Sequence, residues 1–362
     1  LGIGSASQEE LDARLKERVE DFQPDIVTIS FSPSAKGNAF NIAKLVKNAK
    51  CATIPIIVAG GTYLNTVSNR EVLYEAVLDE NTKQIICESA FDCLIRGDGE
   101  QSLVELVRAI ENGGKVPDLL KIRGLSFKHK TRMLQGETWA KIAYGLDALP
   151  WHSMSEEDDK DLRQYNLWIV DQSRKAAPIY TSRKSMDRKE MSINSVAAII
   201  EEVRTYNKRE WKNFIFVEGE FWSDKKRISD FCDALLKSGM VISWKAHFKP
   251  DAIDRDLLVK IKRSGCVSAI FDVGTVSQRI LDAMNEKGST LAKSKQVIRD
   301  AKDVGIEKVG VSVTVGFPGE TEEDAMKAVT FVEQADPSIV EVSQAELPSG
   351  PSWSKDAEEG KG

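Results

Sequence analysis

Short apolar runs alternate with segments of helical periodicity along the first third of the chain. Apolar residues recur every three or four positions in these segments, which predicts amphipathic helices, while the short runs predict buried strands. The expected strands are 25–31, 54–59, 91–96 and 124–128, and the expected helices are 9–22, 41–49, 67–78 and 102–112. Strands that alternate with helices indicate a parallel, doubly wound sheet.

A second series of the same kind begins near residue 176. Its expected strands are 176–182, 213–217, 241–247, 269–273, 310–315 and 339–343, and its expected helices are 193–206, 226–238, 255–264, 291–304 and 322–334. A complete eight-stranded barrel takes about 250 residues, so this shorter half predicts a partial barrel. We therefore expect an α/β protein with a partial Rossmann-like domain at 1–125, a connector at 126–171 and a partial (β/α)6 TIM barrel at 172–362.

Composition excludes several classes of function. The net charge of −6, with Lys and Arg interspersed among acids, argues against nucleic acid as the main partner. No apolar run approaches the roughly 18 residues of a membrane span, and the N-terminus has no secretory signal pattern. The five cysteines are odd in number and lack close metal-type spacing, which favours a reduced, cytoplasmic setting.

Three loops of the first domain follow expected strands, at the edge where open parallel sheets bind ligands. They are rich in small residues and glycine, which let backbone amides approach a phosphate or an amide-rich ligand closely. The candidate binding residues in them are Ser32, Ser34, Gly60, Gly61, Thr62, Gly97, Asp98, Gly99 and Glu100. Each loop alone is also explained as a tight turn or a helix cap.

Taken in order, the three loops resemble the cobalamin-binding domain found ahead of many radical S-adenosylmethionine (SAM) domains. The most specific match is 92–100, which reads DCLIRGDGE. The resemblance implies that cobalamin binds at these loops. That family's domain normally begins with a further strand-helix-strand segment, so we expect residue 1 to lie beyond it. The histidines, His129, His152 and His247, lie outside a DxHxxG context, and the axial cobalt ligand is left open.

The segment 181–192, TSRKSMDRKEMS, resembles the loop that holds the iron-sulfur cluster of radical SAM enzymes. In that loop TSRGCP opens a CxxxCxxC motif, and here the cysteine positions hold Ser185, Lys189 and Ser192. Neither a hydroxyl nor an ammonium group replaces a thiolate ligand well, so we expect no cluster to bind. Lys184, Arg188 and Lys189 make the loop positive, which suits either an anionic ligand or a solvated surface.

The second domain resembles the same family over nearly its whole length, and the resemblance implies a SAM site. The implied contacts are Glu218, Glu220, Ser277, Gly316, Pro318 and Gly319. The first two lie in FVEGEFWSD, and the last three lie in the turn GFPGET. An acid cluster that caps a helix and a Pro-Gly turn are the structural alternatives. Gly274 stands where relatives carry Glu, and the final segment 347–362 lies inside the homologous region, so we expect the C-terminus to be truncated.

Three functions from different classes stay open. The first is a corrinoid-dependent methyltransferase that works without radical initiation on a small-molecule substrate. The second is a non-catalytic homologue that binds cobalamin or a partner subunit and supports an active paralogue. The third is an active enzyme whose cysteines were replaced by engineering, against which the uneven Ser, Lys, Ser pattern argues. The resemblance makes methyl transfer the default chemistry, and substrate identity lies in pocket residues that it leaves open.

Overall fold

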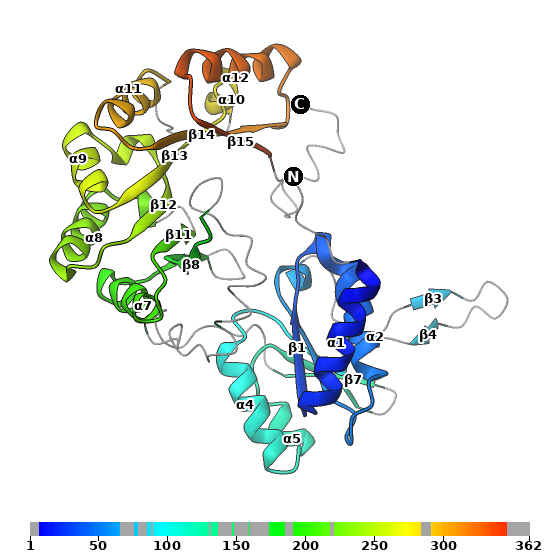
Figure 1. The fold of residues 1–362 in the computed structure, drawn as a ribbon. Coiled ribbons are helices and arrows are strands. Elements are labelled where there is room, and N and C mark those ends of the chain that lie inside the picture. Colours follow the sequence, from blue (N-terminus) through cyan, green and yellow to red (C-terminus); the bar gives the residue numbers. More distant parts are fainter. Residues whose placement is uncertain are drawn as a thin grey trace. The chain divides into compact units, whose positions relative to one another are not determined.

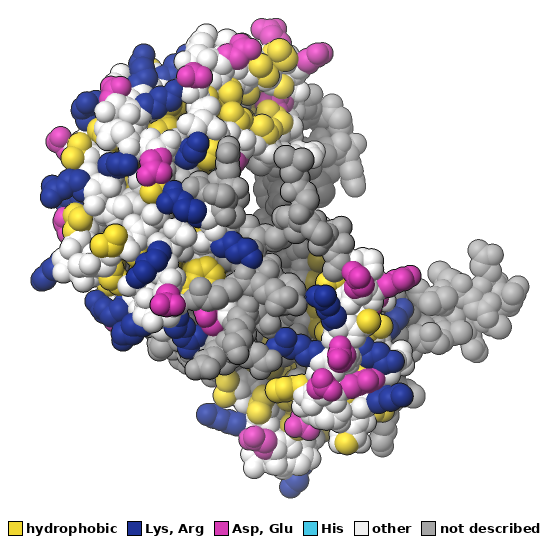
Figure 2. Space-filling model, viewed as in Figure 1, with side chains coloured by type: hydrophobic (Ala, Val, Ile, Leu, Met, Phe, Trp, Pro, Cys, Tyr) yellow, Lys and Arg dark blue, Asp and Glu magenta, His cyan; other side chains and the backbone are white. Residues whose placement is uncertain are grey.

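The computed structural model describes residues 7–65, 76–78, 85–87, 90–129, 132–136, 147, 159, 174–184, 191–217, 221–283 and 291–345 (Figure 1). The chain divides into two units, Leu1–Tyr144 with Lys184–Glu190 and Gly145–Arg183 with Met191–Gly362. Within the described residues, no helix is long and apolar enough to cross a membrane. On the face in Figure 2, Lys and Arg side chains are interspersed with Asp and Glu.

The first unit is built on a mixed five-stranded sheet. Its strands, in spatial order, are β1 (Ile26–Ser30), β2 (Ile56–Gly60), β5 (Cys93–Ile95), β6 (Leu125–His129) and β7 (Arg132–Gln135). Strands β1, β2 and β5 are parallel, whereas β6 pairs antiparallel with β5, and β7 pairs antiparallel with β6. The predicted Rossmann-like strand pattern is therefore confirmed. Strand β7 and most of β6 lie in the range given above to the connector.

Helices α1 (Gln8–Phe22), α2 (Lys36–Lys47), α4 (Glu100–Glu111) and the short α5 (Val116–Leu119) belong to this unit. Phe31 and Phe91 stack in its core, and Phe40 packs edge-on against both, with ring centroids 5.1–6.2 Å apart. Lys47, at the end of α2, donates to Asp92 at 2.6 Å, and the same carboxylate oxygen accepts from the backbone N–H of Ile57 at 2.7 Å. This bridge holds α2 to the sheet.

The expected helix 67–78 is wrong at its end. Ala76–Leu78 forms strand β3, which pairs antiparallel with β4 (Ile85–Cys87). The register sets Val77 against Ile86 and Leu78 against Ile85. Backbone pairing with a second strand therefore replaces the helix that the local period suggested. Residues 66–75 lie outside the described part of the chain.

The second unit is a six-stranded parallel sheet with helices along its outer side (Figure 1). Its strands, in chain order and spatial order alike, are β8 (Ala177–Tyr180), β11 (Asn213–Val217), β12 (Ser243–Phe248), β13 (Cys266–Gly274), β14 (Lys308–Val315) and β15 (Ile339–Gln344). The helices between them are α7 (Val196–Lys208), α8 (Lys225–Ser238), α9 (Arg255–Arg263), the short α10 (Gln278–Ala283), α11 (Leu291–Asp303) and α12 (Glu322–Ala335). The predicted partial barrel is confirmed.

Alternation along the strands gives this sheet two different faces. On β12, Trp244, Ala246 and Phe248 are buried against the helices, while Lys245 and His247 point to the other, inner face. Trp222 stacks on Trp244 with ring centroids 5.5 Å apart, and Phe231 of α8 packs edge-on against both indoles. The outer face is therefore the core, and the inner face is where polar side chains collect.

Two glycines of the second unit both have a left-handed backbone, but only one of them also lacks room for a side chain. Gly239 ends α8 with φ +70°, and a Cβ there would meet nothing within 4 Å. Gly265 has φ +100°, and a Cβ there would lie 2.2 Å from the carbonyl oxygen of Ile242. We expect Gly239→Ala to lower the free energy of unfolding by about 1–2 kcal/mol, the cost of a left-handed residue.

Gly265→Ala adds a clash with backbone, so we expect a loss of about 4 kcal/mol or more. Urea unfolding of both variants, monitored by circular dichroism, measures the loss in the free energy of unfolding for each. Equal losses in the two variants would contradict this explanation.

Candidate functional site

The three loops that carry the candidate cobalamin residues lie at one edge of the first sheet. Ser30 is in register with Gly60, and Ala59 is in register with Leu94, so the carboxyl ends of β1, β2 and β5 meet there. The structure thus brings together Ser32, Ser34, Gly60, Gly61, Thr62, Gly97, Asp98, Gly99 and Glu100. The Thr62 side chain itself lies outside the described atoms.

Gly60, the last residue of β2, and Gly61, which follows it, differ in how much space surrounds them. Gly61 has φ +96°, and a Cβ there would lie 2.5 Å from the N and O atoms of Phe31. Gly60 has nothing within 4 Å of its Cβ position. Chain packing therefore requires Gly61, whereas Gly60 leaves space open at the edge.

Helices α2 and α4 begin at this edge without side-chain caps. Neither Ala35 nor Gly99, their N-cap residues, has a side chain that accepts from the first turn. Backbone N–H groups at such a terminus favour anionic and carbonyl-bearing ligands. Gly97 has φ +102° and Asp98 is buried, so the RGDGE segment turns sharply into α4. This edge fits a ligand rich in amide and phosphate groups.

The loop expected to hold a cluster lies between two short paired strands, β9 (Ser182–Lys184) and β10 (Met191–Ile193). Ser192 is half-buried within β10, while Ser185 and Lys189 lie outside the described residues. None of the three is cysteine. In the described part of the chain, no group of three His, Cys, Asp or Glu side chains is placed to hold a metal ion.

The described cysteines are distributed over both units. Cys51 and Cys93 lie in the first unit, and Cys232 and Cys266 are buried in the second. Burial raises the pKa of the Cys93 and Cys232 thiols to about 12, and it raises the pKa of Cys266 further. These thiols are protonated at neutral pH, whereas a cluster ligand is a thiolate. Among the described residues, these cysteines therefore form no group of three that could hold a metal ion.

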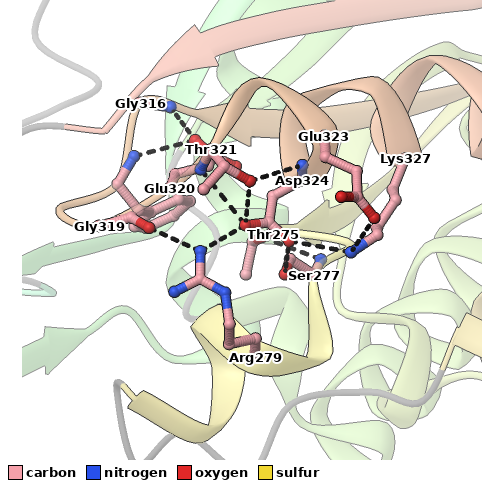
Figure 3. Close-up of polar contacts among 11 residues, drawn as sticks. Thr275, Ser277, Arg279, Gly316, Gly319, Glu320, Thr321, Glu323, Asp324 and Lys327 are labelled. Atoms are coloured by element: carbon pink, nitrogen blue, oxygen red, sulfur yellow. Dashed lines mark hydrogen bonds and ion pairs between the residues drawn. The ribbon is translucent and has the colours of Figure 1, made fainter.

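Ser277, a candidate SAM residue, contacts the buried carboxylate of Asp324, and the candidates Gly316 and Gly319 lie in the adjoining turn (Figure 3). The fourth candidate, Pro318, precedes Gly319 in the sequence of that turn. Ser277 Oγ donates to Asp324 Oδ1 at 2.7 Å, and Lys327 Nζ donates to the same oxygen at 3.0 Å. Arg279 donates to Asp324 Oδ2 and, at 2.6 Å, to the carbonyl oxygen of Gly319. The network ties the loop after β13 to the first turn of α12.

Hydrogen bonds within the turn 316–321 also stabilise it. Glu320 accepts from the backbone N–H groups of Gly316 and Phe317, and Thr321 forms a capping box with Asp324. Arg279, followed by Ser277, Lys327 and Thr321, holds the pKa of the Asp324 carboxyl well below its usual range. Ser277 and Gly316 therefore have partners inside the protein. The other two candidates, Glu218 and Glu220, lie outside the described residues.

The inner face of the second sheet carries a polar cluster that sequence reasoning missed. His247 Nδ1 lies 2.9 Å from Asp272 Oδ1, and His247 Nε2 lies 3.4 Å from Glu341 Oε2. Lys245 Nζ donates to Glu341 Oε1 at 3.0 Å. We call these four residues the inner-face cluster. The sequence feature that could have predicted this cluster is the pattern SWKAHF, in which every second residue of a buried strand is polar.

Two family models match this chain. Residues 30–215 match the Radical SAM N-terminal family, and residues 176–332 match the Radical SAM superfamily. The chain belongs to the radical SAM superfamily. Both matches together cover most of the described strands of the two units.

Curated relatives of this radical SAM protein include methyltransferases and cyclases. It is 25% identical over 323 residues to an uncharacterised methyltransferase of Pyrococcus horikoshii, covering 88% of this chain and 66% of that protein. It is 22% identical over 317 residues to the anaerobic magnesium-protoporphyrin IX monomethyl ester cyclase of Rubrivivax gelatinosus, covering 86% and 54%. The chain thus spans about half to two thirds of the length of these relatives.

Two solved structures share the fold of this radical SAM protein. The radical SAM methyltransferase TsrM of Kitasatospora setae, solved with cobalamin and a [4Fe-4S] cluster, aligns with TM-score 0.67 and 14% identity over 97% of this chain and 67% of that chain. The cobalamin-dependent radical SAM enzyme OxsB aligns with TM-score 0.63 and 15% identity over 96% and 47%. At these identities the likeness is one of fold.

The Asp324 network predicts a pH-dependent loss of stability. Because the folded-state pKa of Asp324 is depressed, its contribution is present above the unfolded pKa of about 4 and is lost as pH falls below that value. We therefore expect Asp324→Asn to lower the melting temperature strongly at pH 7 and progressively less as the pH falls below about 4.

Melting temperatures of both proteins between pH 3 and pH 7 provide the measurement. Asp336→Asn is the control, because the Asp336 side chain is 93% exposed and its carboxylate lies 3.4 Å from Lys302 Nζ. If Asp324→Asn melts below the unaltered protein by the same amount at every pH in this range, the depressed pKa of Asp324 does not stabilise the fold.

Proposed function

We propose that the protein is a cobalamin-binding methyltransferase of the radical SAM superfamily that works without radical initiation. The observation that carries the proposal is the residue set Ser185, Lys189 and Ser192 at the positions of the cluster cysteines. Radical formation needs a cluster with thiolate ligands, and these side chains supply two hydroxyls and one ammonium group. Polar methyl transfer needs no such electron donor.

Cobalamin, when bound, supplies a carrier for the methyl group. Its proposed site is the carboxyl edge of β1, β2 and β5, where two helices begin without side-chain caps and Gly60 leaves open space. In this proposal Ser32, Ser34 and the segment Gly97–Glu100 contact the polar side groups of the corrinoid. Gly61 shapes the loop rather than the ligand site, because its neighbour is Phe31.

SAM is the proposed methyl source, and its proposed contacts are Glu218 and Glu220 at the end of β11. Carboxylates accept from the ammonium and hydroxyl groups of such a ligand. Ser277 acts in this proposal as a positioning residue, since its hydroxyl donates to Asp324. Pro318 and Gly319 form the turn that the same network holds. A methyl acceptor of small size completes the reaction, and four free cysteines among the described residues suit a cytoplasmic setting.

A second candidate is a non-catalytic homologue that binds cobalamin or a partner subunit and supports an active paralogue. Gly274 favours it, because this position carries Glu in the resembled family and a glycine offers SAM no side chain. Consumption of SAM by the cobalamin-loaded protein without added iron separates the two. Turnover supports the methyltransferase, and its absence with cobalamin bound supports the homologue.

Metal analysis after anaerobic iron-sulfur reconstitution tests the central proposal. We expect cobalt close to one per chain and iron near background. The triple variant Ser185→Cys, Lys189→Cys and Ser192→Cys is the matched control, and it is expected to gain iron under the same conditions. Four irons per chain in the unaltered protein would refute the proposal and restore radical chemistry.

Substitutions of Gly60 and Gly61, at the end of β2, test the proposed cobalamin site. We expect Gly60→Val to lower the cobalamin bound per chain at least tenfold with little change in melting temperature, because a side chain there enters open space. We expect Gly61→Val to lower the melting temperature, because its Cβ would meet the backbone of Phe31. Cobalt content and thermal denaturation on the same samples measure both effects. Full cobalamin loading of Gly60→Val would place the ligand elsewhere.

A further inference from the structure

Lys36 places a cation at a helix end where acids are usually found. It is the first residue of α2, and no acidic side chain stands in the first turn of that helix. A helix N-terminus carries a partial positive charge, so Asp and Glu are favoured there and a lysine is not. Helix α4, which begins at the same edge of the sheet, follows the usual rule with Glu100. The start of α2 therefore combines two positive contributions in one place.

Two buried aromatic rings hold the ammonium group of Lys36 in position. Its Nζ atom lies 5.6 Å from the ring centre of Tyr63 and 5.9 Å from that of Phe40. Phe31 in turn stacks on Tyr63 with ring centroids 5.1 Å apart, and its carbonyl oxygen accepts from the backbone N–H of Tyr63 at 3.1 Å. Lys36 comes after β1 and Tyr63 comes after β2. The lysine side chain therefore reaches from one loop of the proposed cobalamin edge to the next.

Among the described residues, no carboxylate forms an ion pair with Lys36. Asp12 of α1 reaches α2, but it accepts from the side chain of Asn41 at 3.3 Å. Asp98 and Glu100 follow β5, which β2 separates from β1. The rings exclude water from part of the ammonium group without neutralising its charge. This position is therefore suited to an anionic group of a ligand.

Space for such a group exists on both sides of the lysine in the chain. Gly37, the second residue of α2, has nothing within 4 Å of its Cβ position, and the same holds for Gly60 at the end of β2. The hydroxyls of Ser32 and Ser34, in the loop before α2, hydrogen-bond to each other at 2.9 Å. A bulky group can therefore approach the first turn of α2 at Gly37 and the end of β2 at Gly60.

We propose that Lys36 binds the phosphodiester of cobalamin and so selects the complete cofactor over corrinoids that lack the nucleotide. The inference rests on the proposed function, to which it adds a specificity-determining residue. The peripheral side chains of the corrin ring are neutral carboxamides, whereas the phosphodiester of the nucleotide loop carries a negative charge. An ammonium group pairs with phosphate through its charge and its donated hydrogen bonds, so Lys36 distinguishes these two parts of the ligand.

Two corrinoids that differ in the phosphodiester provide the test. Equilibrium dialysis measures the dissociation constants of cyanocobalamin and of dicyanocobinamide, which lacks the phosphate, the ribose and the base. We expect Lys36→Met to raise the constant for cyanocobalamin at least tenfold and to change the constant for dicyanocobinamide less than twofold. Lys36→Arg keeps the charge and is expected to bind cyanocobalamin within threefold of the unaltered protein.

Salt provides a second measurement that does not need dicyanocobinamide. Salt screens an exposed ion pair, so an increase of NaCl from about 50 mM to about 500 mM is expected to weaken cyanocobalamin binding by the unaltered protein about threefold. The same increase is expected to leave the weaker binding by Lys36→Met nearly unchanged.

Lys44→Met is the matched control, because Lys44 is an exposed lysine about two turns further along the same helix. We expect it to bind both corrinoids as the unaltered protein does. Melting temperatures of all variants check that they are folded.

The inference fails if Lys36→Met binds cyanocobalamin as tightly as the unaltered protein, or if both proteins respond equally to salt. It also fails if this variant loses affinity for both corrinoids to the same extent, since the lysine then supports the loops and does not meet the phosphate. Each of these results leaves cobalamin binding itself intact. If the unaltered protein binds neither corrinoid, the cobalamin assignment is refuted and the inference with it.

Discussion

Packing of the outer helices on one face of the six-stranded sheet is the interaction on which the second unit depends. The aromatic residues Trp222, Trp244 and Phe231 occupy that side and exclude polar groups from it. Because side chains of a strand alternate between faces, the polar residues between them are forced to the inner side. The core and the inner-face cluster are therefore two results of one alternating pattern.

The sequence predicted the strands of both units well because their apolar runs are short, buried and bounded by helical periodicity. It failed at Ala76–Leu78, where pairing with Ile85 and Ile86 decides the structure. Local periodicity contains no information on such a partner. The resemblance to a family predicted which residues stand at the cluster positions, because that prediction depends only on residue order within one loop.

The inner-face cluster lay beyond sequence reasoning for a different reason. Lys245 and Glu341 are 96 residues apart, and only the register of β12 to β15 brings them within 3.0 Å. A lone histidine such as His247 has many ordinary explanations until its neighbours across the sheet are known. Gly60 and Gly61 at the end of β2 show a similar limit, since the sequence does not distinguish them while the structure places a close neighbour only at the Cβ position of Gly61.

The turn GFPGET and the buried Asp324 beside it have a consequence for how such chains are recognised. Arg279, Ser277 and Thr321 all contact this carboxylate, so changes in the turn act first on folding. Selection for a folded barrel is enough to retain the residues of this turn after a catalytic function has been lost. A search that relies on this turn therefore collects active enzymes and their inactive descendants together, and the cysteine positions have to be read separately to tell them apart.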